Sequence, residues 1–108
     1  MSIQLQDSIA TFFRVSNGAE PSALRHCFTE RAVVRDESHT HQGYEAIQAW
    51  LLEARRKYAY GVEPLDVAQQ GASVKVRAKV TGNFPGSPVE LDHVFRLAGD
   101  RIDLLEIG

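Results

Sequence analysis

Two ionisable side chains in this 108-residue sequence occupy strand-like segments where they should face the protein interior. Asp36 ends a short β-rich run and lies two residues after Val34, so both side chains point to one face of an extended chain. His93 lies between Leu91 and Phe95, in a run that alternates apolar with polar residues. A carboxylate and an imidazole on one covered face predict acid–base chemistry, with Asp36 as the base and His93 as its partner. We therefore expect the two groups to lie within direct or one-water hydrogen-bond reach.

Each of these residues also has an ordinary structural interpretation. An aspartate at a strand end often caps the following loop, and a lone histidine on an apolar face is more often a satisfied core residue than a catalyst. His39 and His41 follow Asp36 in a polar segment, which makes a site of two histidines and one carboxylate conceivable. Histidines in such a loop usually border the mouth of a pocket, so we predict a ligand contact for His41 and neither a metal nor a cofactor.

A helical first half and a strand-rich second half predict a single α+β domain over residues 1–108. Apolar spacing predicts a helix over residues 3–16, a short helix that opens at Pro21 and buries Phe28, and a long helix after Gly43. Residues 32–36 read as a strand and residues 37–42 as a polar loop. Turn signals then separate four predicted strands, near residues 61–69, 73–84, 88–98 and 101–107.

The later strands alternate apolar with polar residues, which is typical of an antiparallel sheet covered on one face only. The three helices must cover that face, and their apolar stripes predict a cone-shaped cavity against the sheet. His93 belongs to the covered face and Asp92 to the opposite one. We expect the apolar walls, which would contact a small apolar molecule, to come from Phe12, Trp50, Tyr60, Val80 and Phe95.

Composition excludes several classes of protein. A net charge of -2 and a pI near 6.0 argue against a nucleic-acid-binding module, which would show a basic face. The single cysteine, Cys27, cannot form an internal disulfide, and no zinc-type array of cysteines and histidines is present. The first residues do not resemble a signal peptide, and no apolar run is long enough to span a bilayer. The expected location is the cytoplasm.

Four segments carry a resemblance to a known superfamily: FTERAVVRD at residues 28–36, HQGYEAIQAW at 41–50, NFPGSPVELDH at 83–93 and DRIDLLEI at 100–107. In their order and spacing the chain resembles the nuclear transport factor 2-like superfamily, in its SnoaL-like branch, related to polyketide cyclases and ketosteroid isomerases. The resemblance implies a cystatin-like cone of three N-terminal helices on a curved antiparallel sheet. Because this fold hosts many reactions, the resemblance alone does not choose one.

Against the ketosteroid isomerases, the resemblance places their general-base aspartate at Asp36 and their protonated aspartate near Asp92 and His93. Their phenol falls on Phe12, which has no donor, so steroid isomerisation by that mechanism is disfavoured. The implied function is a cofactor-independent isomerase, dehydratase or cyclase acting on an apolar substrate. The alternative is a noncatalytic ligand-binding or dimeric accessory domain. Many relatives pair through the convex sheet face, and here Val94 and Thr81 interrupt its charges, so we expect a homodimer.

Overall fold

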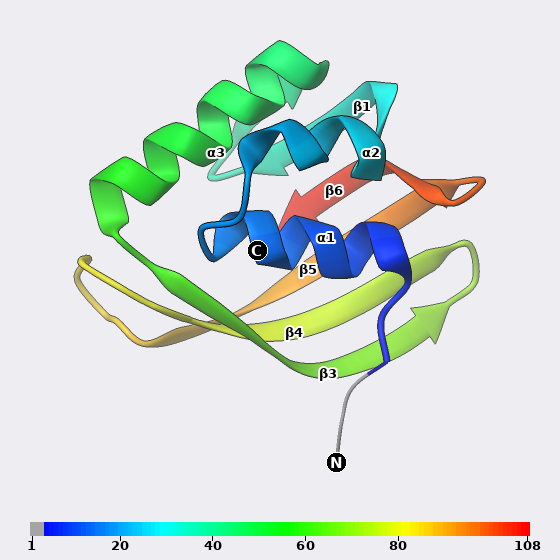
Figure 1. Ribbon diagram of the computed structural model, residues 1–108. Coiled ribbons are helices and arrows are strands. Elements are labelled where there is room, and N and C mark those ends of the chain that lie inside the picture. Colours follow the sequence, from blue (N-terminus) through cyan, green and yellow to red (C-terminus); the bar gives the residue numbers. More distant parts are fainter. Residues whose placement is uncertain (1–3) are drawn as a thin grey trace.

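The computed structural model describes residues 4–108, in which a layer of helices lies on one face of a curved six-stranded sheet (Figure 1). The strands lie in the order β2-β1-β6-β5-β4-β3. The α+β class is confirmed. The elements in chain order are α1 (Asp7–Ser16), the 3-10 helix η1 (Pro21–Ala23), α2 (Leu24–Cys27), β1 (Phe28–Asp36), β2 (His39–Gln42), α3 (Tyr44–Tyr58), β3 (Gly61–Gln70), β4 (Ser73–Thr81), β5 (Val89–Ala98) and β6 (Arg101–Ile107).

The sheet is mixed, so the prediction of a purely antiparallel sheet is wrong at one place. β1 and β6 run parallel, whereas the other neighbouring strands are antiparallel. The reason lies in the connections: α3 carries the chain from β2 to the far edge, and the turns of β3, β4, β5 and β6 bring it back beside β1. This return aligns three residues from three neighbouring strands, because Asp36 pairs with Ile107 and Ile107 pairs with His93.

The segment predicted as a polar loop over residues 37–42 contains a strand. β1 and β2 form a hairpin in which Asp36 pairs with His39 across the two-residue turn Glu37-Ser38. Both turn residues have positive φ, 51° and 67°, as a type I′ turn requires. Asparagine and glycine are the usual residues for that turn, so the sequence carries no hairpin signal here. The strained backbone directly follows Asp36.

Other boundaries shift for simple reasons. α1 begins at Asp7 rather than at residue 3, which lies outside the described residues. Phe28 opens β1 instead of closing the second helix, because the backbone is already extended there (φ -109°, ψ 150°). The predicted strand over residues 73–84 ends at Thr81. The expected turn at Pro85-Gly86 is present: Gly86 has φ 88°, and the Ser87 N–H donates to the Phe84 carbonyl at 3.3 Å.

The core lies between α1, α3 and the concave face of the sheet (Figure 1). Phe12 is its centre, since its ring meets those of Phe13, Phe28 and Phe95 edge-on, at 5.4, 6.0 and 5.7 Å. Burial of a side chain of this size stabilises the fold by about 1.5–3 kcal/mol. Burial also raises the pKa of the Cys27 thiol to about 12, so this cysteine is a core group. None of the helices within residues 4–108 combines the length and the apolarity needed to cross a membrane.

Candidate functional site

A cavity of about 540 Å³ lies between the helices and the concave face of the sheet. It is bordered by the last turns of α1 and α3, by the ends of β1 and β6, and by the loop between β4 and β5. Its wall is mainly apolar and aromatic. The lining residues are Phe12, Ser16, Asp36, Glu37, Trp50, Ala54, Tyr58, Tyr60, Val62, Val80, Phe84, Pro85, Gly86, Val89, Leu91, His93 and Ile107.

Asp36 places a carboxylate in this apolar wall. One of its oxygens, Oδ2, accepts a hydrogen bond from the indole Nε1 of Trp50 at 3.1 Å. Burial raises the pKa of Asp36, the Trp50 hydrogen bond opposes that rise, and the nearby charge of Glu37 adds to it. The other oxygen, Oδ1, has no hydrogen-bond partner within the described residues. Asp36 is therefore an anchored carboxylate with one oxygen available to a ligand, which is the arrangement that a general base needs.

His93 lies deeper in the cavity, on the covered face that the alternation predicts. Its side chain is only 4% exposed, and its ring packs against those of Phe13 at 5.4 Å and Phe95 at 6.3 Å. Burial lowers the pKa of His93 to about 4, so the ring is neutral at pH 7. Its Nδ1 lies 3.4 Å from the Leu91 carbonyl oxygen. When Nδ1 carries the proton and faces that oxygen, Nε2 becomes a hydrogen-bond acceptor.

The structure does not bring Asp36 and His93 into direct contact. No hydrogen bond joins them within residues 4–108, and their strands are separated by β6. Two strand spacings put their backbones about 10 Å apart. Since both side chains line the same cavity, the space between them is room for a ligand. The two side chains thus form no direct hydrogen bond and instead border one cavity from different strands.

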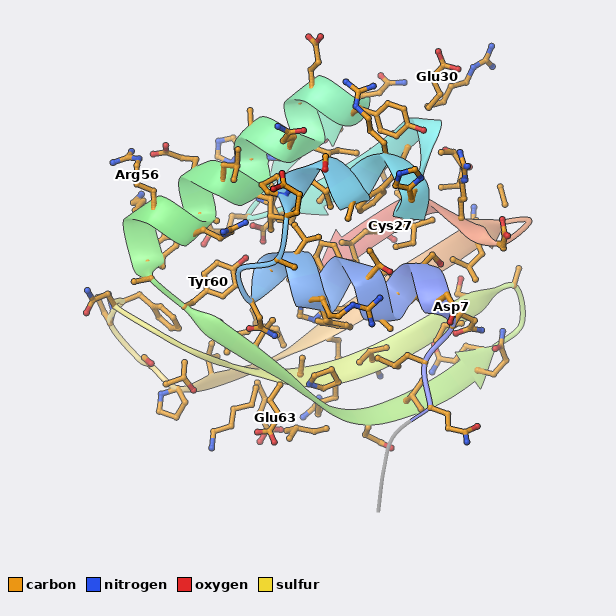
Figure 2. The ribbon with its side chains drawn as sticks, in the orientation of Figure 1. Asp7, Cys27, Glu30, Arg56, Tyr60 and Glu63 are labelled. Atoms are coloured by element: carbon orange, nitrogen blue, oxygen red, sulfur yellow. The ribbon has the colours of Figure 1, made fainter. Side chains whose placement is uncertain are left out.

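Tyr60 and Ser16 add two hydroxyl groups whose chemical role the sequence did not reveal. Tyr60 was expected only as an apolar wall, yet its phenol belongs to the same cavity as Asp36. Burial raises the pKa of Tyr60, the nearby Ser16 hydroxyl and the charge of Arg55 oppose that rise, and the charge of Asp36 adds to it, so the phenol stays protonated at pH 7. Figure 2 shows Tyr60 beside α1, at the inner side of the connection between α3 and β3. The only sequence signal for Ser16 is its place on the apolar stripe of the first helix.

Gly82 fixes the segment that carries Tyr60. A Cβ added at Gly82 would lie 2.8 Å from both the Tyr58 carbonyl oxygen and the Tyr60 Cβ, so any larger residue forces the two segments apart. The neighbouring Asn83 N–H donates to the Tyr58 carbonyl at 2.7 Å, and this bond keeps the two segments close together. No sequence pattern indicates this contact, because Gly82 lies inside a segment predicted as a strand.

The predicted wall residues divide into two groups. Phe12, Trp50, Tyr60 and Val80 line the cavity, but His41 and Phe95 do not. His41 instead stacks on the Trp50 ring, with the ring centres 5.7 Å apart, and so supports the residue that anchors Asp36. Phe95 is fully buried in the core, because it lies two residues beyond His93 along β5, away from the cavity.

Metal ligation was the alternative for the two histidines of the hairpin. The His39 ring is exposed, and its Nδ1 lies 3.0 Å from the Glu37 carbonyl oxygen. Across residues 4–108, no group of three or more histidine, cysteine, aspartate and glutamate side chains is arranged to hold a metal ion.

With the cavity described, comparison with known proteins places the chain in a family. The SnoaL-like domain matches residues 9–104, which is most of the sequence. The chain belongs to the SnoaL-like domain family. No protein of curated function matches it. The resemblance drawn from the sequence motifs is thereby confirmed.

Solved structures of SnoaL-like and related proteins share the fold. A proposed polyketide cyclase from Sinorhizobium meliloti is 40% identical, with a TM-score of 0.92 over 96% of this chain and 95% of that one. A protein with a ketosteroid isomerase-like fold from Catenulispora acidiphila, solved in complex with trimethylamine, is 19% identical, with a TM-score of 0.82 over 97% and 86% of the two chains. A cystatin-fold protein from Novosphingobium aromaticivorans is 17% identical, with a TM-score of 0.77 over 99% of both chains.

Proposed function

We propose that this SnoaL-like protein is an acid–base enzyme of the isomerase, dehydratase or cyclase kind, acting on a small apolar molecule in the cavity. The observation that carries the proposal is Asp36: a carboxylate on an apolar cavity wall, with a raised pKa and one oxygen held by Trp50. Perturbed carboxylates in cavities of this kind are enriched at catalytic sites. The fold and family hold many chemistries, so the residues carry the argument.

In the proposed reaction, Asp36 Oδ1 removes a proton from a carbon beside a carbonyl group. The electron pair of the broken C–H bond moves to the carbonyl oxygen and forms an enolate. A neutral donor must then stabilise that oxygen, and the protonated phenol of Tyr60 suits this role. Return of the proton from Asp36 to another carbon gives an isomer, and loss of a leaving group gives an elimination product. Neither outcome requires a cofactor.

His93 takes a narrower part than sequence reasoning assigned to it. Because its pKa is about 4, it is not an imidazolium acid at neutral pH. As a neutral ring it orients the substrate by one hydrogen bond from the cavity floor. Phe12, where ketosteroid isomerases are expected to carry a phenol, contributes packing only, and Tyr60 supplies a phenol from the connection between α3 and β3.

Hydrogen–deuterium exchange tests the proposal. Small cyclic ketones, enones and β-keto compounds would be incubated with the protein in D₂O, and exchange beside the carbonyl followed by NMR. The wild type should accelerate exchange of at least one class, and Asp36→Asn should lose about 10²–10⁴-fold of that rate. Asp92→Asn, on the opposite face of the sheet, is the matched control and should keep full activity. Exchange that persists unchanged in Asp36→Asn would remove Asp36 from the mechanism.

The alternative is a noncatalytic ligand-binding domain. It is favoured by the packing of His93 among Phe12, Phe13 and Phe95, which is how a satisfied core histidine would lie. Under this alternative the cavity still binds a small molecule. Wild-type protein that binds carbonyl compounds but exchanges none of their protons would support it.

A further inference from the structure

The cavity wall carries hydroxyl groups that can donate as well as accept, but its charged groups are all acidic. Asp36 and Glu37 are the acidic residues of the wall, and His93 offers a neutral ring. Among the lining residues of the described chain there is no lysine and no arginine. An unpaired carboxylate in an apolar wall is costly, and an occupant that carries a positive charge relieves this cost.

The ends of two helices also favour a positive charge in the cavity. Ser16 is the last residue of α1 and Tyr58 the last residue of α3, and both line the cavity. The carboxyl end of a helix carries partial negative charge from its unpaired carbonyl groups, which favours a nearby cation.

The arginines of these last turns do not fill that place, and Lys57 Nζ lies 5.2 Å from the centre of the Tyr58 ring. Arg14 donates to the Thr11 hydroxyl at 2.9 Å, and Arg55 donates to the Ala19 carbonyl at 3.3 Å. Arg56, which points outward in Figure 2, pairs with Glu53 on the surface of the same helix. None of the three lines the cavity.

A deeply buried imidazole indicates what kind of cation fits. His93 is 96% shielded from solvent, and within residues 4–108 its Nε2 has no hydrogen-bond partner. In the tautomer whose Nδ1–H faces the Leu91 carbonyl, Nε2 presents a lone pair. Asp36 Oδ1 presents another from across the cavity. Two acceptors that face one space require a donor with more than one N–H, rather than a quaternary ammonium ion.

We propose that the cavity binds a protonated amine with apolar substituents, its ammonium group between Asp36 and His93 and its substituents against the aromatic wall. The inference concerns binding and does not require proton abstraction. Because an amine and a carbon acid would both engage Asp36, the amine should also inhibit any proton exchange of ketones competitively.

Binding of four benzyl compounds, measured by calorimetry at pH 7.5, tests the proposal. Benzylamine is the protonated donor, benzyl alcohol its neutral counterpart, benzyltrimethylammonium a cation without N–H, and benzoate an anion. Benzylamine should bind at least about tenfold more tightly than benzyl alcohol and than the quaternary ion, and benzoate least tightly. Asp36→Asn should abolish the preference for benzylamine over benzyl alcohol, whereas Asp92→Asn, a matched change on the convex face, should preserve it.

Melting curves of both variants confirm that they are folded before binding is compared. Equal affinity for benzylamine and benzyl alcohol, undiminished preference in Asp36→Asn, or dissociation constants above about 10 mM for benzylamine would overturn the proposal. If benzyltrimethylammonium bound as tightly as benzylamine, the inference that His93 needs an N–H donor on the ligand would be wrong. These outcomes are separate from the exchange experiment: amine selectivity without ketone exchange would reject the enzymatic function and keep the amine site.

Discussion

Asp36 and Asp92 are carboxylates on opposite faces of one sheet, and their surroundings have opposite effects. On the concave face, burial raises the pKa of Asp36, and an indole N–H bonds to it. On the convex face, partial desolvation of Asp92 would raise its pKa, but the hydrogen bond and charge of Arg77, with the charge of Lys75, lower it. Arg77 Nε and Lys75 Nζ lie 3.2 and 3.5 Å from its two oxygens.

The difference shows how one alternating strand places ionisable groups in opposite surroundings on the two faces of the sheet. His93 follows Asp92 in the chain, yet it lies with Asp36 on the covered face, where its own ionisation is also disfavoured. On the convex face, Lys75 and Arg77 form partly exposed ion pairs with Asp92 and Glu90, and such pairs contribute little to stability. On the concave face, the carboxylate of Asp36 forms no ion pair within the described residues, and we propose that a ligand supplies its partner.

The largest expected effect is the acid sensitivity that His93 gives to the fold. Its folded pKa, about 4, lies below its ordinary value of 6.5, so the unfolded chain binds its proton more readily. Stability due to the neutral ring is therefore complete above pH 6.5 and falls as the pH drops toward 4, by about 3 kcal/mol in all. In urea unfolding at pH 7 and pH 4, the wild type should lose that much more free energy than His93→Leu. Equal losses in the two proteins would mean that the ring is not desolvated.

A smaller effect on the melting temperature is expected when Asp36 or Asp92 is replaced by asparagine, and its sign should differ between the two faces of the sheet. Because the pKa of Asp36 is raised in the folded state, its ionised form lowers the free energy of unfolding. This destabilisation is present at neutral pH and disappears as the pH falls below the folded pKa. Asp36→Asn should therefore melt at the same temperature as wild type or higher at pH 7, with the gain vanishing in acid. Asp92→Asn should melt slightly lower at pH 7, because the stability from its lowered pKa is present above the ordinary value and lost in acid. A loss in both variants would make Asp36 a structural residue.

The features that the sequence predicted correctly depend on local periodicity. Alternation along residues 88–98 placed His93 on the covered face and Asp92 on the opposite one. A period of two leaves only two possible registers, and the hydrophobic side chains choose between them. The order of helices and strands followed from the same patterns.

The features that it missed depend on contacts between distant segments. Glu37-Ser38 forms a hairpin turn without glycine or asparagine, because pairing of β2 with the edge of β1 holds it. Gly82 matters through a backbone that lies more than twenty residues away in the chain. The distance between Asp36 and His93 depends on β6, which enters the sheet between their strands.

The smallest expected effect concerns assembly through the convex face, where we predict a homodimer. The ion pairs of Arg77 with Asp92 and Glu90 neutralise charges that would otherwise oppose contact. Val94 pairs with Lys75 on one side and Glu106 on the other, so it brings an apolar group to the middle of this face. A stable interface needs about 800 Å² from each partner, and the open face of the sheet is where we expect it.

Light scattering at tens of micromolar should therefore give twice the mass of the chain, and Val94→Asp should give the monomer, because it buries an unpaired charge in the contact. Leu52→Asp, which adds the same charge at an exposed position on α3, should leave the dimer intact. Both variants should keep amine binding, since the cavity lies on the other side of the sheet. A wild type that scatters as a monomer would contradict the predicted dimer. The paired charges of the convex face would then be in contact with water, and Asp92 would differ from Asp36 because it faces solvent rather than a ligand.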